Sequence, residues 1–116
     1  MRHELDLSSI PQRFHSQAVK SRGTNVLEKL NYLITWYEKS STHDGSDGFQ
    51  REFLRLTGEI AKNLRSILIQ DTPELTQQAV LAYVPISYQG YMTSTSSAHR
   101  EAYAYLTIEL NNIAQS

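Results

Sequence analysis

The sequence contains no cysteine, and this absence removes several classes of protein from consideration. Without cysteine there is no disulfide framework, no thiolate zinc site and no cysteine nucleophile. Long apolar runs are also missing: the longest lies around residues 79–84, whereas a membrane-spanning helix needs roughly 20 apolar residues. Residues 1–7 alternate charged residues with leucine and lack the apolar core of a secretory signal. We therefore expect a cytoplasmic protein with no membrane contact.

A large excess of either charge is absent as well. The formal net charge is −1, so no overall field attracts nucleic acid. The charges are mildly uneven: residues 1–70 hold ten Lys/Arg and eight Asp/Glu, and residues 71–116 hold one Arg and four acids. The hydrophobic fraction of 40% and the charged fraction of 20% are typical of a folded protein. A length of 116 residues fits one domain.

Hydrophobic periodicity predicts helices along most of the chain. Apolar residues recur at intervals of three and four, as on one face of a helix, and do not alternate with the period of two typical of a strand. Capping residues support three of the helix starts, because Ser, Thr, Asn and Asp side chains accept hydrogen bonds from the first turn. These starts are Asn25 with Glu28, Asp47 with Gln50, and Thr72 with Pro73. The five predicted helices cover residues 11–22, 25–39, 47–70, 72–84 and 97–113.

The remaining stretches favour irregular structure. We expect residues 1–8 to be flexible and residues 40–48 and 85–97 to form loops. Pro85 should end or kink the fourth helix, because proline has no N–H to donate within a helix. Amphipathic helices joined by short connections pack most simply side by side. Residues 1–116 are therefore predicted to form an all-α fold, a single-domain antiparallel helical bundle of four to five helices.

No motif indicates chemistry, so we predict no catalytic residue, no cofactor site and no metal site. The four histidines are not spaced three or four residues apart, as ligands on one helix would be. Residues 43–48 offer oxygen atoms at the alternating positions of a calcium loop, but Arg55 stands where the closing acid belongs. His99 could switch with pH, but we expect a half-buried, hydrogen-bonded histidine at the end of the bundle.

A basic stripe on the third predicted helix is one candidate binding surface. Its four cations fall within about 80° of arc at 100° per residue, opposite the apolar stripe. This arrangement is a candidate site for phosphate or for an acidic partner. The alternative is an ordinary solvated helix face, since Glu52 and Glu59 lie among the cations. The basic stripe consists of Arg51, Arg55, Lys62 and Arg65.

A tyrosine-rich region is the second candidate surface. The fourth predicted helix is apolar nearly all round, and the fifth carries a second apolar strip at Ala104 and Ile108. Tyrosine is enriched in protein interfaces because it combines a large apolar ring with a polar tip. The alternative is that these rings close the end of the bundle. The predicted partner-binding residues are Tyr83, Tyr88, Tyr91, Met92, Tyr105 and Ile108.

These features favour a non-enzymatic protein–protein interaction module, such as a small adaptor, inhibitor or chaperone-like regulator. The apolar excess on the last two predicted helices also suggests a homodimer. The alternative is a nucleic-acid-associated helical protein that uses the basic stripe. An enzyme ranks third, because catalytic residues can converge from distant segments.

Overall fold

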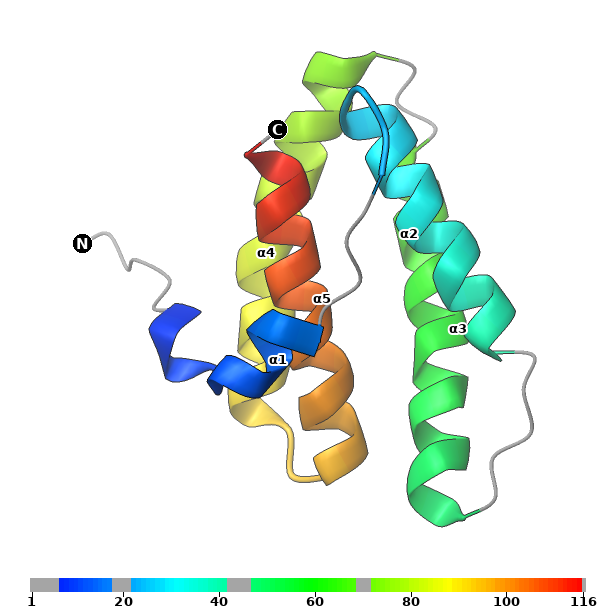
Figure 1. Ribbon diagram of the computed structural model, residues 1–116, viewed down its shortest axis with the longest axis vertical. Helices are drawn as coiled ribbons and strands as arrows, with labels where there is room; N and C mark the ends of the chain where they lie inside the picture. The colour runs from blue at the N-terminus through cyan, green and yellow to red at the C-terminus, as the bar shows by residue number, and fades with distance from the viewer. Residues whose placement is uncertain (1–6, 18–21, 42–46, 69–71, 116) are drawn as a thin grey trace.

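The computed structural model describes residues 7–17, 22–41, 47–68 and 72–115. These residues form five α-helices and a short 3₁₀ turn, with no strand among them, which confirms the predicted all-α helical bundle (Figure 1). None of the helices in these ranges has the length and apolar character needed to cross a membrane. The elements are the 3₁₀ turn Leu7–Ser9, α1 Gln12–Gln17, α2 Val26–Ser41, α3 Gly48–Leu68, α4 Pro73–Thr93 and α5 Ser97–Ala114.

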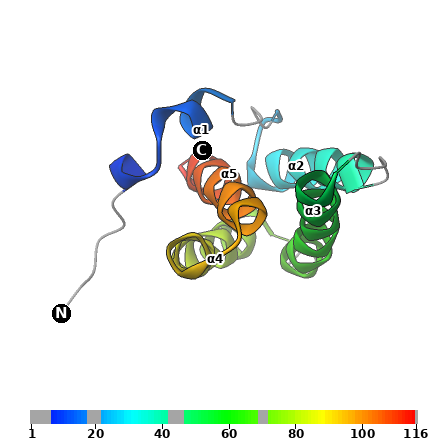
Figure 2. The same ribbon diagram turned by 90° about the horizontal axis from the view of Figure 1, so that it is seen from below.

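The long helices are arranged as two antiparallel pairs. Helices α2 and α3 form one pair, α4 and α5 form the other, and α5 also packs against α3 (Figures 1 and 2). Helix α1 lies against α5 on the side away from α4 (Figure 2). Helix α5 is therefore enclosed by its neighbours, whereas α4 lies at the edge of the bundle.

The main core lies between the two pairs and is almost entirely aliphatic. Residues from α2, α3, α4 and α5 contribute to it, and many of them have no exposed surface. Such close-packed apolar burial is the main source of stability in a small domain. The most fully buried large side chains of this core are Leu30, Leu33, Ile34, Leu64, Val80, Leu106, Leu110 and Ile113.

The predicted helix caps are confirmed by hydrogen bonds. In each case a side-chain oxygen accepts from the backbone N–H three residues later, which satisfies one of the donors left over in the first turn. The bonds join Asn25 Oδ1 to Glu28 N at 3.0 Å, Asp47 Oδ1 to Gln50 N at 2.8 Å, and Thr72 Oγ1 to Leu75 N at 3.2 Å.

The predicted loop at residues 85–97 is wrong. Helix α4 runs through Pro85 to Thr93, and residues 94–96 alone connect it to α5. Pro85 lies on the exposed side of α4, so water can reach the carbonyl of Leu81 that loses its helical partner. Val84 and Ser87, on the opposite side, are buried in the bundle. Packing of that buried side holds the helix together across the proline.

Several other predicted boundaries also change. Helix α2 extends to Ser41 and α3 begins at Gly48, so the expected loop at residues 40–48 is shorter, and its residues 42–46 lie outside the described residues. Of the segment expected to be flexible, Leu7 and Ser8 belong to the 3₁₀ turn, and residues 1–6 are not described. The first helix is observed as Gln12–Gln17, and residues 18–21 lie outside the described residues.

Candidate protein-interaction surface

The second apolar strip of α5 is covered by the N-terminal segment of the same chain. Ile10 and Phe14 are buried against Ala104 and Ile108, together with Tyr91 of α4. These residues form a second, smaller core on the far side of α5. A segment from the start of the chain therefore covers this strip.

Aromatic contacts and a hydrogen bond hold this N-terminal cover in place. The ring of Phe14 meets that of Tyr105 edge-on, with centroids 5.1 Å apart, an arrangement that aromatic pairs prefer. The hydroxyl groups of Ser9 and Tyr88 lie 2.9 Å apart and share a hydrogen bond. Two of the tyrosines that we expected to bind a partner, Tyr88 and Tyr105, therefore contact the chain's own N-terminal segment.

The other predicted partner-binding residues are spread over different environments. Tyr91 and Ile108 are only 6% and 4% exposed, so they lie below the surface. Tyr83 is half-buried against the main core, and this burial raises the pKa of its hydroxyl. Met92, by contrast, is 58% exposed. The structure thus does not bring the six residues together on one surface.

Four exposed large apolar side chains lie instead on the outer face of α4. Ile86 is 62% exposed and Leu81 is 50% exposed, although both belong to a helix whose other side enters the core. No charged residue occurs between Glu74 and Arg100, so α4 has no charge on this side beyond its first turn. The outer face of α4 comprises the apolar residues Leu75, Leu81, Ala82, Pro85, Ile86 and Met92 and the polar residues Gln78 and Gln89.

The buried side of α4 fixes which residues point outward. The hydroxyl groups of Ser87 and Thr107 lie 2.7 Å apart inside the α4–α5 contact, and Thr107 Oγ1 also donates to the carbonyl of Tyr103. Three residues further along α4, the helix packs so closely against α5 that a Cβ on Gly90 would lie 3.0 Å from the Tyr103 ring. A rotation of α4 would break these contacts, so they hold the outer face toward solvent.

The basic stripe of α3 is partly neutralised by ion pairs. Arg55 binds Glu52 and Glu59 on its own helix. Arg65 reaches across to α2, where its Nε and Nη2 each lie 2.6 Å from a carboxylate oxygen of Glu38. Arg51 and Lys62 are exposed. Fewer positive charges are therefore left for phosphate or an acidic partner than the sequence spacing indicates.

His99 links the start of α5 to α3 and is half-buried, as the sequence led us to expect. Its Nε2 lies 2.8 Å from Oε1 of Glu52. Hydrogen bonds from Arg55 and then from His99 lower the pKa of Glu52 from its ordinary 4.5 to about 2. The three side chains form a small polar link between two helices.

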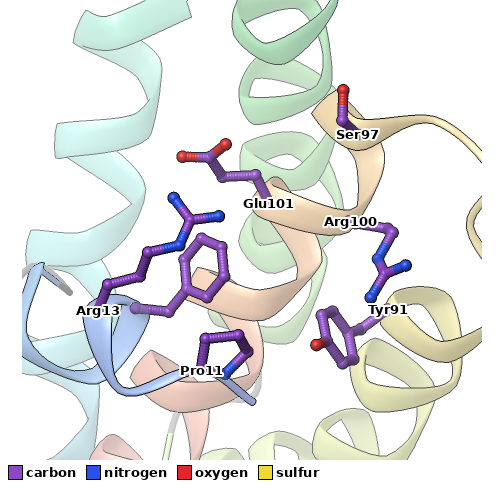
Figure 3. Close-up of a pocket in the computed structure, with 7 residues that line it drawn as sticks. Pro11, Arg13, Tyr91, Ser97, Arg100 and Glu101 are labelled. Carbon is purple, nitrogen blue, oxygen red and sulfur yellow. The ribbon is translucent and has the colours of Figure 1, made fainter.

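A small cavity lies between α1 and α5, beside the N-terminal cover (Figure 3). Its volume is about 260 Å³. The guanidinium groups of Arg13 and Arg100 lie over the rings of Phe14 and Tyr91, 4.2 and 5.3 Å from the ring centres. Glu101 also lines the cavity, so its charges are of both signs. These cation–π contacts lie within each wall of the cavity, one inside α1 and the other between α5 and α4.

Sequence reasoning missed a buried acid on α5. Glu109 is 1% exposed, and its Oε1 accepts no hydrogen bond from the residues that the structure describes. Burial raises the pKa of the neighbouring Tyr37, and the charge of Glu109 raises it further. Helical periodicity could have identified this burial, because 100° per residue places Glu109 on the same side of the helix as Ala102 and Leu106.

The described residues hold no cluster of three or more His, Asp or Glu side chains positioned to share a metal ion. Comparison of the chain with protein-family models, curated proteins and solved structures finds no match. Fold and surface therefore define the class of this molecule: a small all-α bundle with an uncovered, uncharged helix face.

Proposed function

We propose that this protein is a non-enzymatic protein–protein interaction module and that the outer face of α4 is its docking surface. The observation that supports this most directly is the run of exposed apolar side chains on one side of a long helix. Isolated exposed apolar residues are common on soluble domains, but contiguous ones mark binding sites. The absence of charge along this face strengthens the case, because charged residues are depleted at interface centres.

The shape of the surface suggests how a partner binds. A helix face presents side chains in rows at intervals of three and four, which a second helix can fit between. Burying one side chain such as Ile86 against a partner contributes about 1.5 kcal/mol or more to the free energy of binding, at roughly 25 cal/mol per Å² of apolar area. Several such side chains provide enough binding energy for a regulatory contact, after the entropy cost of association.

Affinity capture with a single charged substitution tests the proposal. A tagged protein should retain a partner from an extract of its source, and Ile86→Glu should reduce that retention at least tenfold, because a buried carboxylate would lose its hydration. Trp36→Glu is the matched control, since Trp36 is an apolar residue of α2 that is 44% exposed. Equal retention by both variants and the unaltered protein would contradict a docking role for α4.

A further inference from the structure

The exposed positions of α4 from Glu74 to Thr93 are symmetric about the middle of that stretch. Residues pair around a point between Tyr83 and Val84, so that the two numbers of each pair add to 167. Helical periodicity alone makes the positions symmetric, because a face that is centred on the helix looks the same from both ends. The positions by themselves therefore say nothing about a partner.

The residue types at these positions match as well, and periodicity does not require that. Each apolar residue mirrors an apolar one and each glutamine mirrors a glutamine, while Glu74 mirrors the uncharged Thr93. In an antiparallel isologous pair centred on this point, residue i of one copy lies level with residue j of the other and the reverse, so the match places apolar side chains beside apolar ones and amides beside amides. The pairs on the outer face are Leu75 with Met92, Gln78 with Gln89, Leu81 with Ile86, and Ala82 with Pro85.

From this match we infer that a second copy of the chain occupies the outer face, with the two α4 helices antiparallel and crossing at their midpoints. The inference rests on the proposed function and names the partner. At the centre, Ala82 lies in one layer with Pro85 of the second copy, and their small side chains let the helices approach closely. On either side, Gln78 lies in one layer with Gln89 of the second copy, so their amide groups can pair rather than remain buried without partners.

Charge favours the antiparallel arrangement over a parallel one. In a parallel pair the Glu74 carboxylates of the two copies would lie at the same end, and like charges repel. In the antiparallel pair they lie at opposite ends, about 28 Å apart along the axis at 1.5 Å per residue. The helix dipoles also oppose one another in this arrangement and partly cancel.

The size of the contact sets the expected strength. Helix α4 has 21 residues and is about 32 Å long, so a contact along it alone is at the small end of specific interfaces. We therefore expect a dissociation constant on the order of 10 µM.

Site-specific crosslinking tests the register, because the chain contains no cysteine of its own. Leu75→Cys and Met92→Cys are prepared as two separate proteins and treated with a short bismaleimide, alone and as a mixture, at 100 µM. In the antiparallel pair residue 75 of one copy faces residue 92 of the other, whereas the two copies of residue 75 are about 25 Å apart. A covalent dimer should therefore form in the mixture and not in either protein alone.

The other outcomes overturn the inference. A covalent dimer from Leu75→Cys alone would show that the two α4 helices pair in parallel. The absence of a covalent dimer in all three reactions would show that the outer face of α4 does not bind a second copy. Sedimentation of the unaltered protein provides a second measurement if a cysteine variant fails to fold. Its average mass should rise between 1 and 100 µM, and that of Ile86→Glu should remain monomeric. A monomer at all concentrations, together with loss of a different captured protein in Ile86→Glu, would overturn the self-pairing and leave the docking role intact.

Discussion

Helices α4 and α5 are both rich in apolar residues, but they differ in how much of each is buried. Helix α5 is buried on two sides, by the main core and by the N-terminal cover of Ile10 and Phe14. Helix α4 is buried on one side and leaves residues such as Ile86 in solvent. An apolar strip in the sequence therefore identifies a helix surface that favours burial. It does not say which segment covers that surface, because the covering segment can lie far away in the sequence.

The first way to test this comparison is to make the same substitution on both helices. Leu110→Ala should lower the free energy of unfolding by about 4 kcal/mol, because Leu110 has no exposed surface and its truncation leaves a cavity. Leu81→Ala on the outer face of α4 should change it by less than about 0.5 kcal/mol. Urea unfolding at 1 µM, below the dissociation constant expected for the proposed dimer, provides both values. A loss of several kcal/mol for Leu81→Ala would mean that the outer face of α4 is buried within the monomer.

The second test removes the cover from α5. Phe14→Ala should cost about 3 kcal/mol if the N-terminal segment folds with the bundle, because Phe14 is buried against Tyr105 and Ile108. Should the segment instead open on its own, amide exchange will rise in α1 and on the α1-facing side of α5 while α2 and α3 keep their protection. Arg22→Ala is the control, since Arg22 is exposed and follows the cover in the chain. Unchanged stability and unchanged amide exchange in Phe14→Ala would show that burial of Phe14 does not hold the N-terminal segment against α5.

Local signals account for the parts of the fold that the sequence predicted well. Caps such as Asn25 and Thr72 act within one turn, so their hydrogen bonds can be inferred from neighbouring residues. Pro85 misled the prediction because the cost of a proline depends on which side of the helix it occupies. That side is decided by Val84 and Ser87 packing in the bundle, which is a tertiary effect.

The candidate surface was predictable only in part. The apolar character of α4 and the two strips of α5 follow from periodicity, and Met92 is exposed as a surface residue should be. Tyr91 and Ile108 are buried because Ile10, more than 80 positions earlier in the chain, packs against the same cluster. Contacts at such separation leave no trace in a local pattern, so tyrosine content alone could not separate an interface from a second core.

The third test concerns the close contact that orients α4. Gly90→Val should cost about 2 kcal/mol, because even its Cβ would lie 3.0 Å from the Tyr103 ring and overpacking of this kind forces neighbours to move. The gain in helix propensity over glycine offsets less than about 1 kcal/mol. Gln89→Val, on the exposed face one position earlier, is the control and should be close to neutral. Equal stability of the two variants would show that the α4–α5 spacing does not depend on Gly90.

The smallest effect is expected at the polar link between α3 and α5. The pKa of Glu52 is lowered from 4.5 to about 2, mainly by Arg55 and then by His99. A carboxyl group whose pKa is lower in the folded state stabilises the fold when it is ionised. Its contribution is therefore complete above about pH 4.5 and is lost as the pH falls toward 2. Glu52→Gln should flatten the dependence of unfolding free energy on pH across this window.

Two further variants divide the effect between the neighbours of Glu52. Arg55→Gln should remove more of the pH dependence between 4.5 and 2 than His99→Gln, since Arg55 makes the larger contribution to the lowered pKa. Both effects should shrink in 1 M NaCl, because the side chains are partly exposed and salt screens exposed charges. An unchanged acid profile in Glu52→Gln would mean that this link does not stabilise the α3–α5 contact. The contact between α3 and α5 would then depend chiefly on apolar packing in the main core.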